Sequence, residues 1–242
     1  MTPILNLYES PILREATGPV IRPGGFDLTD RGLGLCKLKQ GARVLDVGCG
    51  TGAGVARLWR RHGLRATGLD LSAALLKEGS QTHGGLPLIR GRAEQIPAAD
   101  NRFGAVLCEC VLSLCPHPQR VLGEMRRVLQ PGGRLVLTDV YARIAGDSEW
   151  QGRVSVRCCL QGAVDRPTVE KRMTAAGFML ELWEDHTALL KQLAARLIWT
   201  YGSLDAFWSA AGGACAGGGK DKDGAAVAGH PGYYMVVARK PT

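Results

Sequence analysis

The residues best suited to bind a ligand lie in the stretch VLDVGCGTGAG at positions 44–54. An apolar run delivers Asp46 to a turn that contains Gly48, Gly50 and Gly52, and a helical pattern follows directly. Glycine lets a backbone adopt positive φ and approach a ligand closely, while the N-terminus of the next helix offers free N–H groups. This stretch therefore predicts a loop that cradles a ligand with an anionic part.

A second carboxylate extends this pattern. Asp70 ends the next apolar run, and in folds of this kind such a residue meets a ribose, because a carboxylate can accept hydrogen bonds from both vicinal hydroxyls. The loop and Asp70 together are more specific than either part alone. Because residues 48–53 also fit the dinucleotide pattern GxGxxA, a nicotinamide or flavin enzyme is an alternative on this evidence.

Strands and helices must alternate to position these groups. Short, nearly continuous apolar runs predict strands covered on both faces, namely ARVLDV, RATGLD, LPLIRG, FGAVLCE and RLVLTDV. The helical stretches between them predict parallel strands joined by right-handed crossovers, and hence a doubly wound α/β sheet. FMLELWEDHT and GYYMVVARKP add two further strands near the C-terminus.

Local signals predict several helix ends. Ser72 is expected to cap the helix LSAALLKEG and Gly79 to end it, whereas RPTVEKRMTAAGF is expected to be capped near Thr168 and closed by Gly177. HTALLKQLAARLIWTYGSLDAFW predicts one apolar helical stretch, and the Gly-rich residues after it are expected to be mobile. One helix face is expected to pack in the core through Val121, Leu122, Met125, Val128 and Leu129.

Five stretches of the sequence occur in the same order as the motifs of a known protein family. VLDVGCGTG, GLDLS, GRAEQIP, FGAVLCECVLSL and LQPGGRLVLTD resemble successive motifs of class I S-adenosylmethionine-dependent methyltransferases, nearest to the subgroup with quinone-biosynthesis and arsenite methyltransferases. The resemblance covers roughly residues 40–140 and implies S-adenosyl-L-methionine as cofactor. It also implies a mostly parallel seven-stranded sheet with helices on both faces and an antiparallel last strand. Dinucleotide enzymes are not expected to share the later motifs.

The resemblance also implies roles around the cofactor. It assigns cofactor contacts to Asp46, Gly48, Cys49, Gly50, Gly52, Asp70, Leu71 and Cys108. The glycine loop would pass beneath the methionine and ribose, and Asp46 would orient this loop or meet the amino group. Asp70 would hold the ribose hydroxyls, Leu71 would lie against adenine, and Cys108 would line the floor near the sulfonium. As alternatives, Asp46 could bond only loop amides, and Cys49 and Cys108 could be small buried hydrophobes.

The adenine segment departs from the family pattern. Family members usually read Asp-Ala-Glu where this chain has Arg92, Ala93 and Glu94, and the acidic residue there binds the adenine amine. An arginine is a donor only and cannot accept a hydrogen bond from that amine. Adenine recognition is therefore expected to shift to the backbone of Ala93 and Glu94 or to the Glu94 carboxylate.

The methyl acceptor is less defined. Methyl transfer from a sulfonium is an in-line displacement with an activated leaving group, so no obligatory catalytic residue is named. A small-molecule acceptor is expected, with an RNA or protein methyltransferase and a non-catalytic cofactor-binding module as alternatives. CECVLS stands where nucleic-acid methyltransferases carry an NPPY-like element, and the net charge of +8 is spread along the chain. Nucleic acid is therefore not the expected partner. Asp139 could face the acceptor or satisfy a loop.

Two segments are expected to cover the acceptor above the carboxyl ends of the strands. Residues 1–38 are expected to form a helical lid in front of a methyltransferase domain of residues 39–242, and Arg22 in this segment can pair with an anion. Residues 186–230 form an insertion between the last two strands. It contains Trp199, Tyr201, Phe207 and Trp208, whose helical spacing favours core packing over substrate contact.

The eight cysteines indicate a reduced, cytoplasmic protein, because a chain of 242 residues does not need disulfides to fold. Their spacing does not match a zinc site, so no metal is expected. Cys158 and Cys159 are interpreted as small buried hydrophobes, not as ligands that hold a soft metalloid together with Cys215, so arsenite is not the expected substrate. No membrane-spanning run or signal-peptide pattern occurs, and the oligomeric state cannot be inferred.

Overall fold

A single mixed sheet forms the centre of the molecule. The computed structural model describes residues 7–18, 20–144, 158–211 and 231–242. The strands of this part are β1 (Arg43–Val47), β2 (Arg65–Asp70), β3 (Leu88–Arg90), β4 (Phe103–Glu109), β5 (Leu129–Ala142), β6 (Met179–Asp185) and β7 (Pro231–Arg239). They follow the order β3-β2-β1-β4-β5-β7-β6, in which β7 runs antiparallel to both neighbours. The expected mostly parallel, doubly wound sheet with an antiparallel last strand is confirmed.

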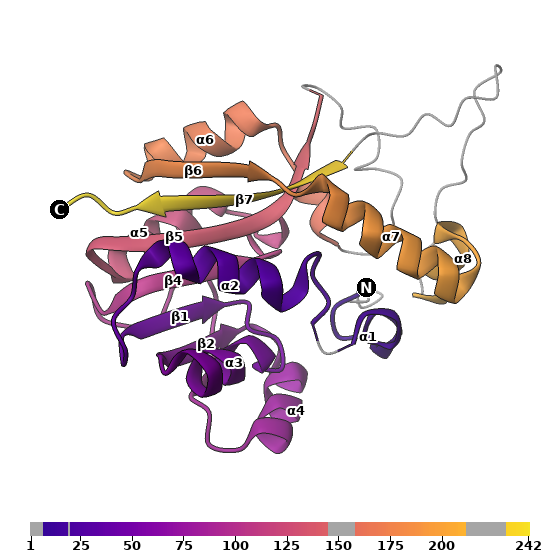
Figure 1. Ribbon diagram of the computed structural model, residues 1–242, viewed down its shortest axis with the longest axis horizontal. Helices are drawn as coiled ribbons and strands as arrows, with labels where there is room; N and C mark the ends of the chain where they lie inside the picture. Colours follow the sequence, from indigo (N-terminus) through magenta and orange to yellow (C-terminus); the bar gives the residue numbers. More distant parts are fainter. Residues whose placement is uncertain (1–6, 19, 145–157, 212–230) are drawn as a thin grey trace.

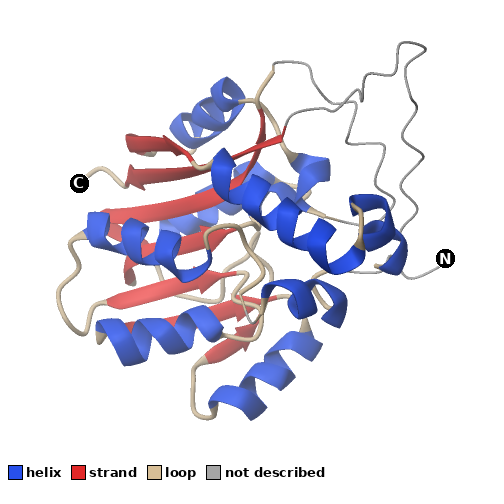
Figure 2. Ribbon diagram, turned by 45° about the vertical axis from the view of Figure 1, so that its right-hand side comes forward, coloured by secondary structure: helices blue, strands red, loops and turns tan. Residues whose placement is uncertain are grey.

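Helices cover both faces of this sheet (Figures 1 and 2). The described helices are α1 (Pro11–Thr17), α2 (Gly25–Cys36), α3 (Ala53–His62), α4 (Ala73–His83), α5 (Pro118–Val128), α6 (Arg166–Ala175), α7 (Thr187–Tyr201) and α8 (Leu204–Ala210). Two short 3₁₀ helices, η1 (Leu112–Leu114) and η2 (Cys159–Gly162), lie in loops. Residues of α2 and α3 share one buried cluster with the sheet, and residues of α5 and α6 share another on the opposite face.

Strand β4 shows how the sheet divides its side chains between these layers. Successive strand residues point to opposite faces. Ala105 and Leu107 accordingly pack in the cluster of α2 and α3, whereas Val106 and Cys108 pack in the cluster of α5 and α6. Glu109, the last residue of β4, returns to the side of α2.

Parallel pairing brings the carboxyl ends of three strands to one edge of the sheet. Val47 of β1 pairs with Leu69 of β2 and with Cys108 of β4. The loops that leave β1, β2 and β4 therefore start side by side. Helices α1, α7 and α8 gather beyond this edge, on the right of Figure 1.

The segment of residues 1–38, expected to form a lid, has two different parts where it is described. Leu28, Leu33 and Cys36 of α2 are buried in the same cluster as sheet residues, so α2 is one of the layers on the sheet. Leu13 of α1 belongs instead to a third cluster with α7 and α8, outside the two sheet layers.

Most helix signals are confirmed, and one expected helix end is wrong. Ser72 caps α4 as expected, but α4 continues past Gly79 to His83, because this glycine lets the helix pass close to the carbonyl of Thr51. Asp165 caps α6, and its carboxylate accepts a hydrogen bond from the Thr168 N–H. The helical stretch at residues 186–208 is divided into α7 and α8 at Gly202, where φ is +86°.

Within the described ranges, every helix is too short or too polar to cross a lipid bilayer.

Candidate functional site

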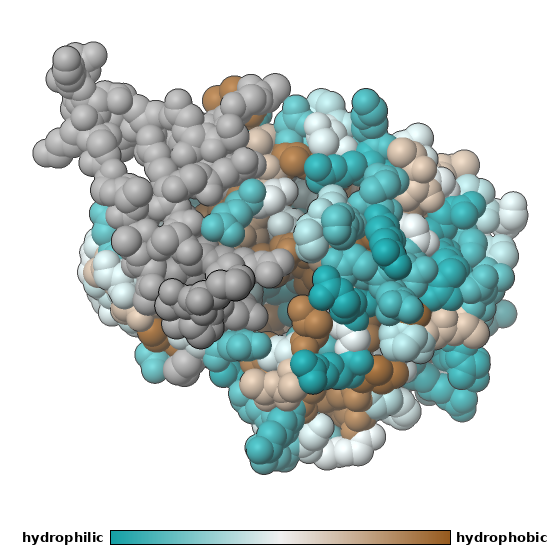
Figure 3. Space-filling view, turned by 180° about the vertical axis from the view of Figure 1, so that it is seen from behind, coloured by the Kyte–Doolittle hydropathy of each residue, from teal (hydrophilic) through white to brown (hydrophobic). Residues whose placement is uncertain are grey.

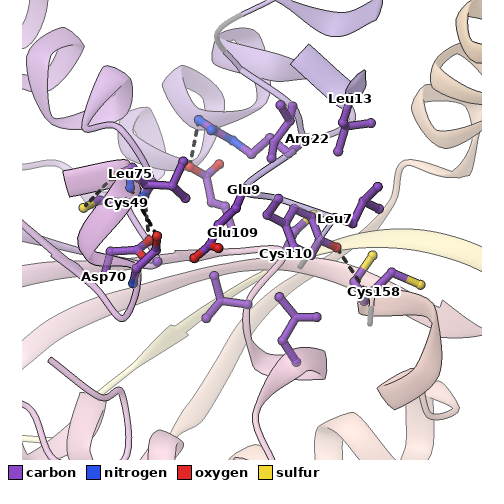
Figure 4. A pocket seen from close by; sticks show the side chains of 18 of the residues that line it. Leu7, Glu9, Leu13, Arg22, Cys49, Asp70, Leu75, Glu109, Cys110 and Cys158 are labelled. Atoms are coloured by element: carbon purple, nitrogen blue, oxygen red, sulfur yellow. Dashed lines mark hydrogen bonds and ion pairs between the residues drawn. The ribbon is translucent and has the colours of Figure 1, made fainter. Parts of the chain in front are cut away.

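A cavity of about 790 Å³ opens at the carboxyl edge of the parallel strands. Its walls come from the loops after β1, β2 and β4, from the residues before α2, and from α1, α7 and α8. Figure 4 shows Arg22, Asp70 and Glu109 around this cavity. Ligand sites for small molecules are typically concave and have volumes of roughly 300–1,000 Å³. In open α/β sheets they lie at this edge. The cavity is therefore the candidate site.

The glycine loop presents bare backbone to the cavity. Gly50 has φ +56°, and no heavy atom lies within 4 Å of the position where a Cβ would stand. The N–H groups of Gly48 and Cys49 donate to the Leu69 carbonyl at 2.7 and 3.1 Å, which ties the loop to the end of β2. A ligand can consequently lie directly against Gly50, where any other residue would be strained and would project into the cavity.

Asp70 faces the cavity and also holds the loop. Its two carboxylate oxygens accept hydrogen bonds from the N–H groups of Gly50 and Ser72, each at 2.8 Å. Each oxygen has a further lone pair for a ligand hydroxyl. Burial raises the pKa of Asp70, and these backbone hydrogen bonds oppose that shift.

A group of charges lies where β1, β4 and the residues before α2 meet. Arg22 Nη2 lies 2.9 Å from Glu109 Oε2, and Thr29 donates its hydroxyl to Glu109 Oε1 at 2.9 Å. Arg22 Nε is buried and has no hydrogen-bond partner among the described residues. Burial and the Glu109 charge raise the pKa of Asp46 to about 7, although Arg22 lowers it.

Arg22 therefore leaves a polar atom available to a ligand. Arg22 and Asp46 both line the cavity. Among the described residues, Arg22 Nε is the one buried side-chain nitrogen or oxygen without a hydrogen-bond partner. Buried polar groups are normally hydrogen-bonded, so this donor in the cavity wall indicates a ligand that carries an acceptor.

The segment expected to contact adenine also lines the cavity. Arg92, Ala93 and Glu94 all belong to its wall, and Arg92 Nη2 lies 3.5 Å from Glu94 Oε1. The Glu94 backbone carbonyl accepts a hydrogen bond from Arg120 Nε at 3.0 Å. The Glu94 carboxylate, which accepts no such bond, is thus the better acceptor for a ligand amine. Leu71 is 56% exposed and belongs to the same wall.

Two expected contacts lie away from the cavity. Cys108 is fully buried against the layer of α5 because it alternates with Leu107 along β4. Gly52 starts α3 with φ +78°, and a side chain there would collide with Leu88 instead of reaching the cavity. Cys108 and Gly52 are therefore absent from the cavity wall, Gly52 serves the turn, and the cofactor contacts expected of both stay predictions.

The strand end offers Glu109 and Cys110 to the cavity in place of Cys108. Sequence reasoning missed both, although the period of two along β4 could have identified Glu109. Cys110 has φ +57°, which is unusual for a residue with a side chain, and its Sγ lies 3.1 Å from the Tyr233 hydroxyl. Asp139 does not face this cavity, because its carboxylate accepts hydrogen bonds from the Ser113 hydroxyl and N–H and from the Val140 N–H.

Cys158 and Cys159 line the far end of the cavity. Cys158 is 2% exposed, and burial raises the pKa of both thiols. The Cys159 N–H donates to the Tyr8 hydroxyl at 3.0 Å. Among the described residues, no three His, Cys, Asp or Glu side chains come together as metal ligands, and Cys215 lies outside these residues.

The aromatic residues expected between the last two strands have different environments. Trp199 is 92% exposed, whereas Phe207 is 1% exposed. Tyr201 donates its hydroxyl to the Ile12 carbonyl at 2.8 Å and so connects α7 with α1. Phe207 and Trp208 pack against each other and also line the cavity.

Comparison with known proteins places this cavity in context. Residues 45–137 match the family described as a methyltransferase domain. The chain is 44% identical over 104 residues to phthiotriol/phenolphthiotriol dimycocerosates methyltransferase 1 of Mycobacterium ulcerans, which corresponds to 42% of this chain and 38% of that protein. It is 39% identical over 99 residues to demethylmenaquinone methyltransferase of Renibacterium salmoninarum, or 41% of each chain. The matches thus span about two fifths of these relatives.

Solved structures resemble the chain over a greater length. The [4+2]-cyclase SpnF is 28% identical with a TM-score of 0.73, and the alignment covers 98% of this chain and 93% of that one. Phosphoethanolamine N-methyltransferase 2 of Haemonchus contortus, solved with S-adenosyl-L-methionine, shares the fold with a TM-score of 0.74 at 19% identity, over 96% of this chain and 56% of that one. Residues 45–137 therefore resemble a methyltransferase domain in sequence, and the chain shares the fold of these solved structures.

Proposed function

We propose that this protein transfers a methyl group from S-adenosyl-L-methionine to a small-molecule acceptor. One observation carries the proposal: the glycine loop and Asp70 open onto the same cavity as a separate set of apolar walls. A cofactor and an acceptor can therefore occupy one enclosed space, as an in-line displacement requires.

The residues present fit this cofactor. Asp70 has free lone pairs for the ribose hydroxyls, and the open position at Gly50 leaves room for the ligand. The Asp46 carboxylate in the cavity wall suits the ammonium group of the methionine part, and the orphaned Arg22 Nε suits its carboxylate. This complementarity of charge assigns the methionine part to the wall between β1 and the residues before α2.

The adenine part is assigned to the other end of the same wall. Glu94 offers a carboxylate to the adenine amine, and Leu71 and Ala93 offer apolar contacts. Cys49 lines the cavity beside Gly50 and is held protonated, because burial and the charge of Asp46 raise its pKa. These assignments follow the expected roles, except for Gly52 and Cys108.

The main task of the protein in this reaction is to position the acceptor against the methyl group. The bound cofactor supplies an activated methyl group on a sulfonium. The cavity walls orient the acceptor. Helix α1 and the α7–α8 pair cover the cavity and so exclude water from it. Glu109 is the carboxylate in the cavity wall beside this methionine site that can accept a proton from the acceptor.

The resemblance to a cyclase over nearly the whole chain supports a second candidate. A protein with this fold can act on a substrate in the cavity without transferring the methyl group, and the cofactor would then serve only to shape the site. An RNA or protein acceptor is less well supported, since a cavity of about 790 Å³ has the size that is typical of small-molecule sites. We also infer a cytoplasmic location, because a chain of 242 residues with eight cysteines does not need disulfides to fold.

The test uses S-adenosylmethionine with a deuterated methyl group and an extract of small molecules from the source cells. Mass spectrometry is expected to find a small molecule that gains three deuterium atoms, together with stoichiometric S-adenosylhomocysteine. Cofactor binding with a changed substrate but without S-adenosylhomocysteine would support the cyclase-like candidate instead. Failure to bind S-adenosylhomocysteine at all would refute both.

A further inference from the structure

The cavity has one charged end and one uncharged end. The described residues that contribute charged side chains to its wall are Glu9, Arg14, Arg22, Asp46, Asp70, Arg92, Glu94 and Glu109. Six of these belong to the cofactor wall described above, namely Arg22, Asp46, Asp70, Arg92, Glu94 and Glu109. The other two also lie toward that end: Glu9 raises the pKa of Asp70 by its charge, and Arg14 pairs with Glu78 of α4 at 2.5 Å.

The uncharged end is built by three separate parts of the chain. Leu7 and Leu13 come from the N-terminal region, Cys158 to Leu160 from the residues around η2, and the remaining side chains from α7 and α8. Close up, Leu7, Leu13 and Cys158 lie together on one side of the cavity, away from Asp70 (Figure 4). Seen from behind, hydrophobic side chains gather around a hollow near the middle of the surface (Figure 3).

Helix α7 is amphipathic with respect to this cavity. Leu190, Leu193, Ala194 and Leu197 line it at the spacing that places residues on one helix face. The charged residues Lys191 and Arg196 of the same helix are exposed on other faces. The uncharged side of α7 is thus directed to the cavity and not to the sheet core alone.

These side chains form a hydrophobic cluster that is separate from the two sheet clusters. Its buried members include Leu7, Leu13, Leu197 and Phe207. A cluster that served folding alone would be expected to close on itself, because protein interiors are packed without large voids. Here the same residues line a cavity that is continuous with the cofactor wall.

We infer that the methyl acceptor is a predominantly apolar molecule whose uncharged body lies between α1 and the α7–α8 pair, with its reacting end toward Glu109. This inference rests on the proposed function and specifies its acceptor. Small polar acceptors such as amino acids or phosphorylated amines do not fit, because the acceptor end lacks charged side chains among the described residues to replace their hydration.

The test measures binding of a neutral apolar fluorophore, N-phenyl-1-naphthylamine, to the full chain saturated with S-adenosylhomocysteine. Saturable binding with one site per chain is expected. Leu193→Gln is expected to weaken it by at least about tenfold, since it places an amide in the apolar wall. Ala194→Trp, which fills the same space, is expected to abolish it. Trp199→Gln is the matched control on the same helix and is expected to change the dissociation constant less than twofold.

The outcomes separate this inference from the proposed function. If S-adenosylhomocysteine binds but the fluorophore does not, the apolar end is closed or filled by another part of the chain, and the inference is wrong while the proposed function stands. Equal effects of Leu193→Gln and Trp199→Gln would also overturn it. If Leu193→Gln lowers the melting temperature so far that the fold is lost, Ala194→Trp decides. Loss of S-adenosylhomocysteine binding in the wild type would instead refute the proposed function.

Discussion

Asp70 offers the most direct test of the cofactor wall. Its carboxylate accepts two backbone hydrogen bonds of 2.8 Å, from Gly50 and Ser72, and keeps one lone pair on each oxygen for a ribose hydroxyl. Removing hydrogen bonds to a charged group costs about 1 to 3 kcal/mol, which corresponds to roughly a 5- to 150-fold weaker dissociation constant. Asp70→Ala is expected to weaken S-adenosylhomocysteine binding by this factor in isothermal titration calorimetry.

The same substitution also releases Gly50 from its anchor, so loss of affinity alone does not identify the ribose contact. The 2′,3′-dideoxy form of S-adenosylhomocysteine separates the two effects. The wild type is expected to bind this analogue less tightly than the parent nucleoside, whereas Asp70→Ala should bind both with similar affinity. If the analogue loses the same factor in both proteins, Asp70 does not hold the ribose. Asp27→Ala, an exposed acidic residue at the start of α2, is the control.

Further predictions concern other parts of the site. Gly50→Val should abolish S-adenosylhomocysteine binding while far-ultraviolet circular dichroism stays unchanged, and retained binding would contradict the position of the loop backbone. Because the pKa of Asp46 is about 7, the affinity for the ammonium-bearing ligand should rise between pH 6 and 8 with release of a proton, and Asp46→Asn should remove this dependence in calorimetry. The free energy of unfolding of the unliganded protein should fall as the pH rises from about 4 to 7, because in this range only the unfolded state releases the Asp46 proton. A free energy of unfolding that does not change over this range would count against the burial of this carboxyl. NAD should give no binding heat. The protein should not methylate arsenite, and the Cys158→Ser, Cys159→Ser double variant should still bind the cofactor. If the wild type methylates arsenite in the presence of thiol and this variant does not, the prediction about arsenite is wrong.

The sheet and the cofactor loop could be predicted because their signals are local. Strand β1, Gly48, Gly50 and Asp70 follow one another within a short stretch, and each residue type is dictated by the backbone or ligand beside it. The expected helix end at Gly79 fails for a related reason. Glycine there serves a close approach to the Thr51 carbonyl, and a sequence pattern alone does not distinguish this from a helix terminus.

The difference at Cys108, which was expected in the cavity wall and lies outside it, has another origin. Its position at the end of β4 was inferred from order along the chain, but the face of a strand on which a residue lies depends on the period of two. Leu107 and Glu109 share the α2 side, so Cys108 must lie on the α5 side. Applying the alternation to FGAVLCE would have exchanged Cys108 for Glu109 as the residue facing the ligand.

The ion pair of Arg22 and Glu109 in the cavity wall could not be predicted from any local sequence pattern. Arg22 lies far from Glu109 in the chain, and their contact exists only because α2 packs on the sheet beside β5 and positions the residues before it over the end of β4. Burying a charge is costly unless it is paired, so the Arg22–Glu109 pair explains how both charged groups can remain in the cavity wall. The pair leaves Arg22 Nε without a partner, and neither α2 nor β4 supplies one. The packing that completes the fold therefore leaves one donor available in the wall, and a ligand that fills this cavity should carry an acceptor for it.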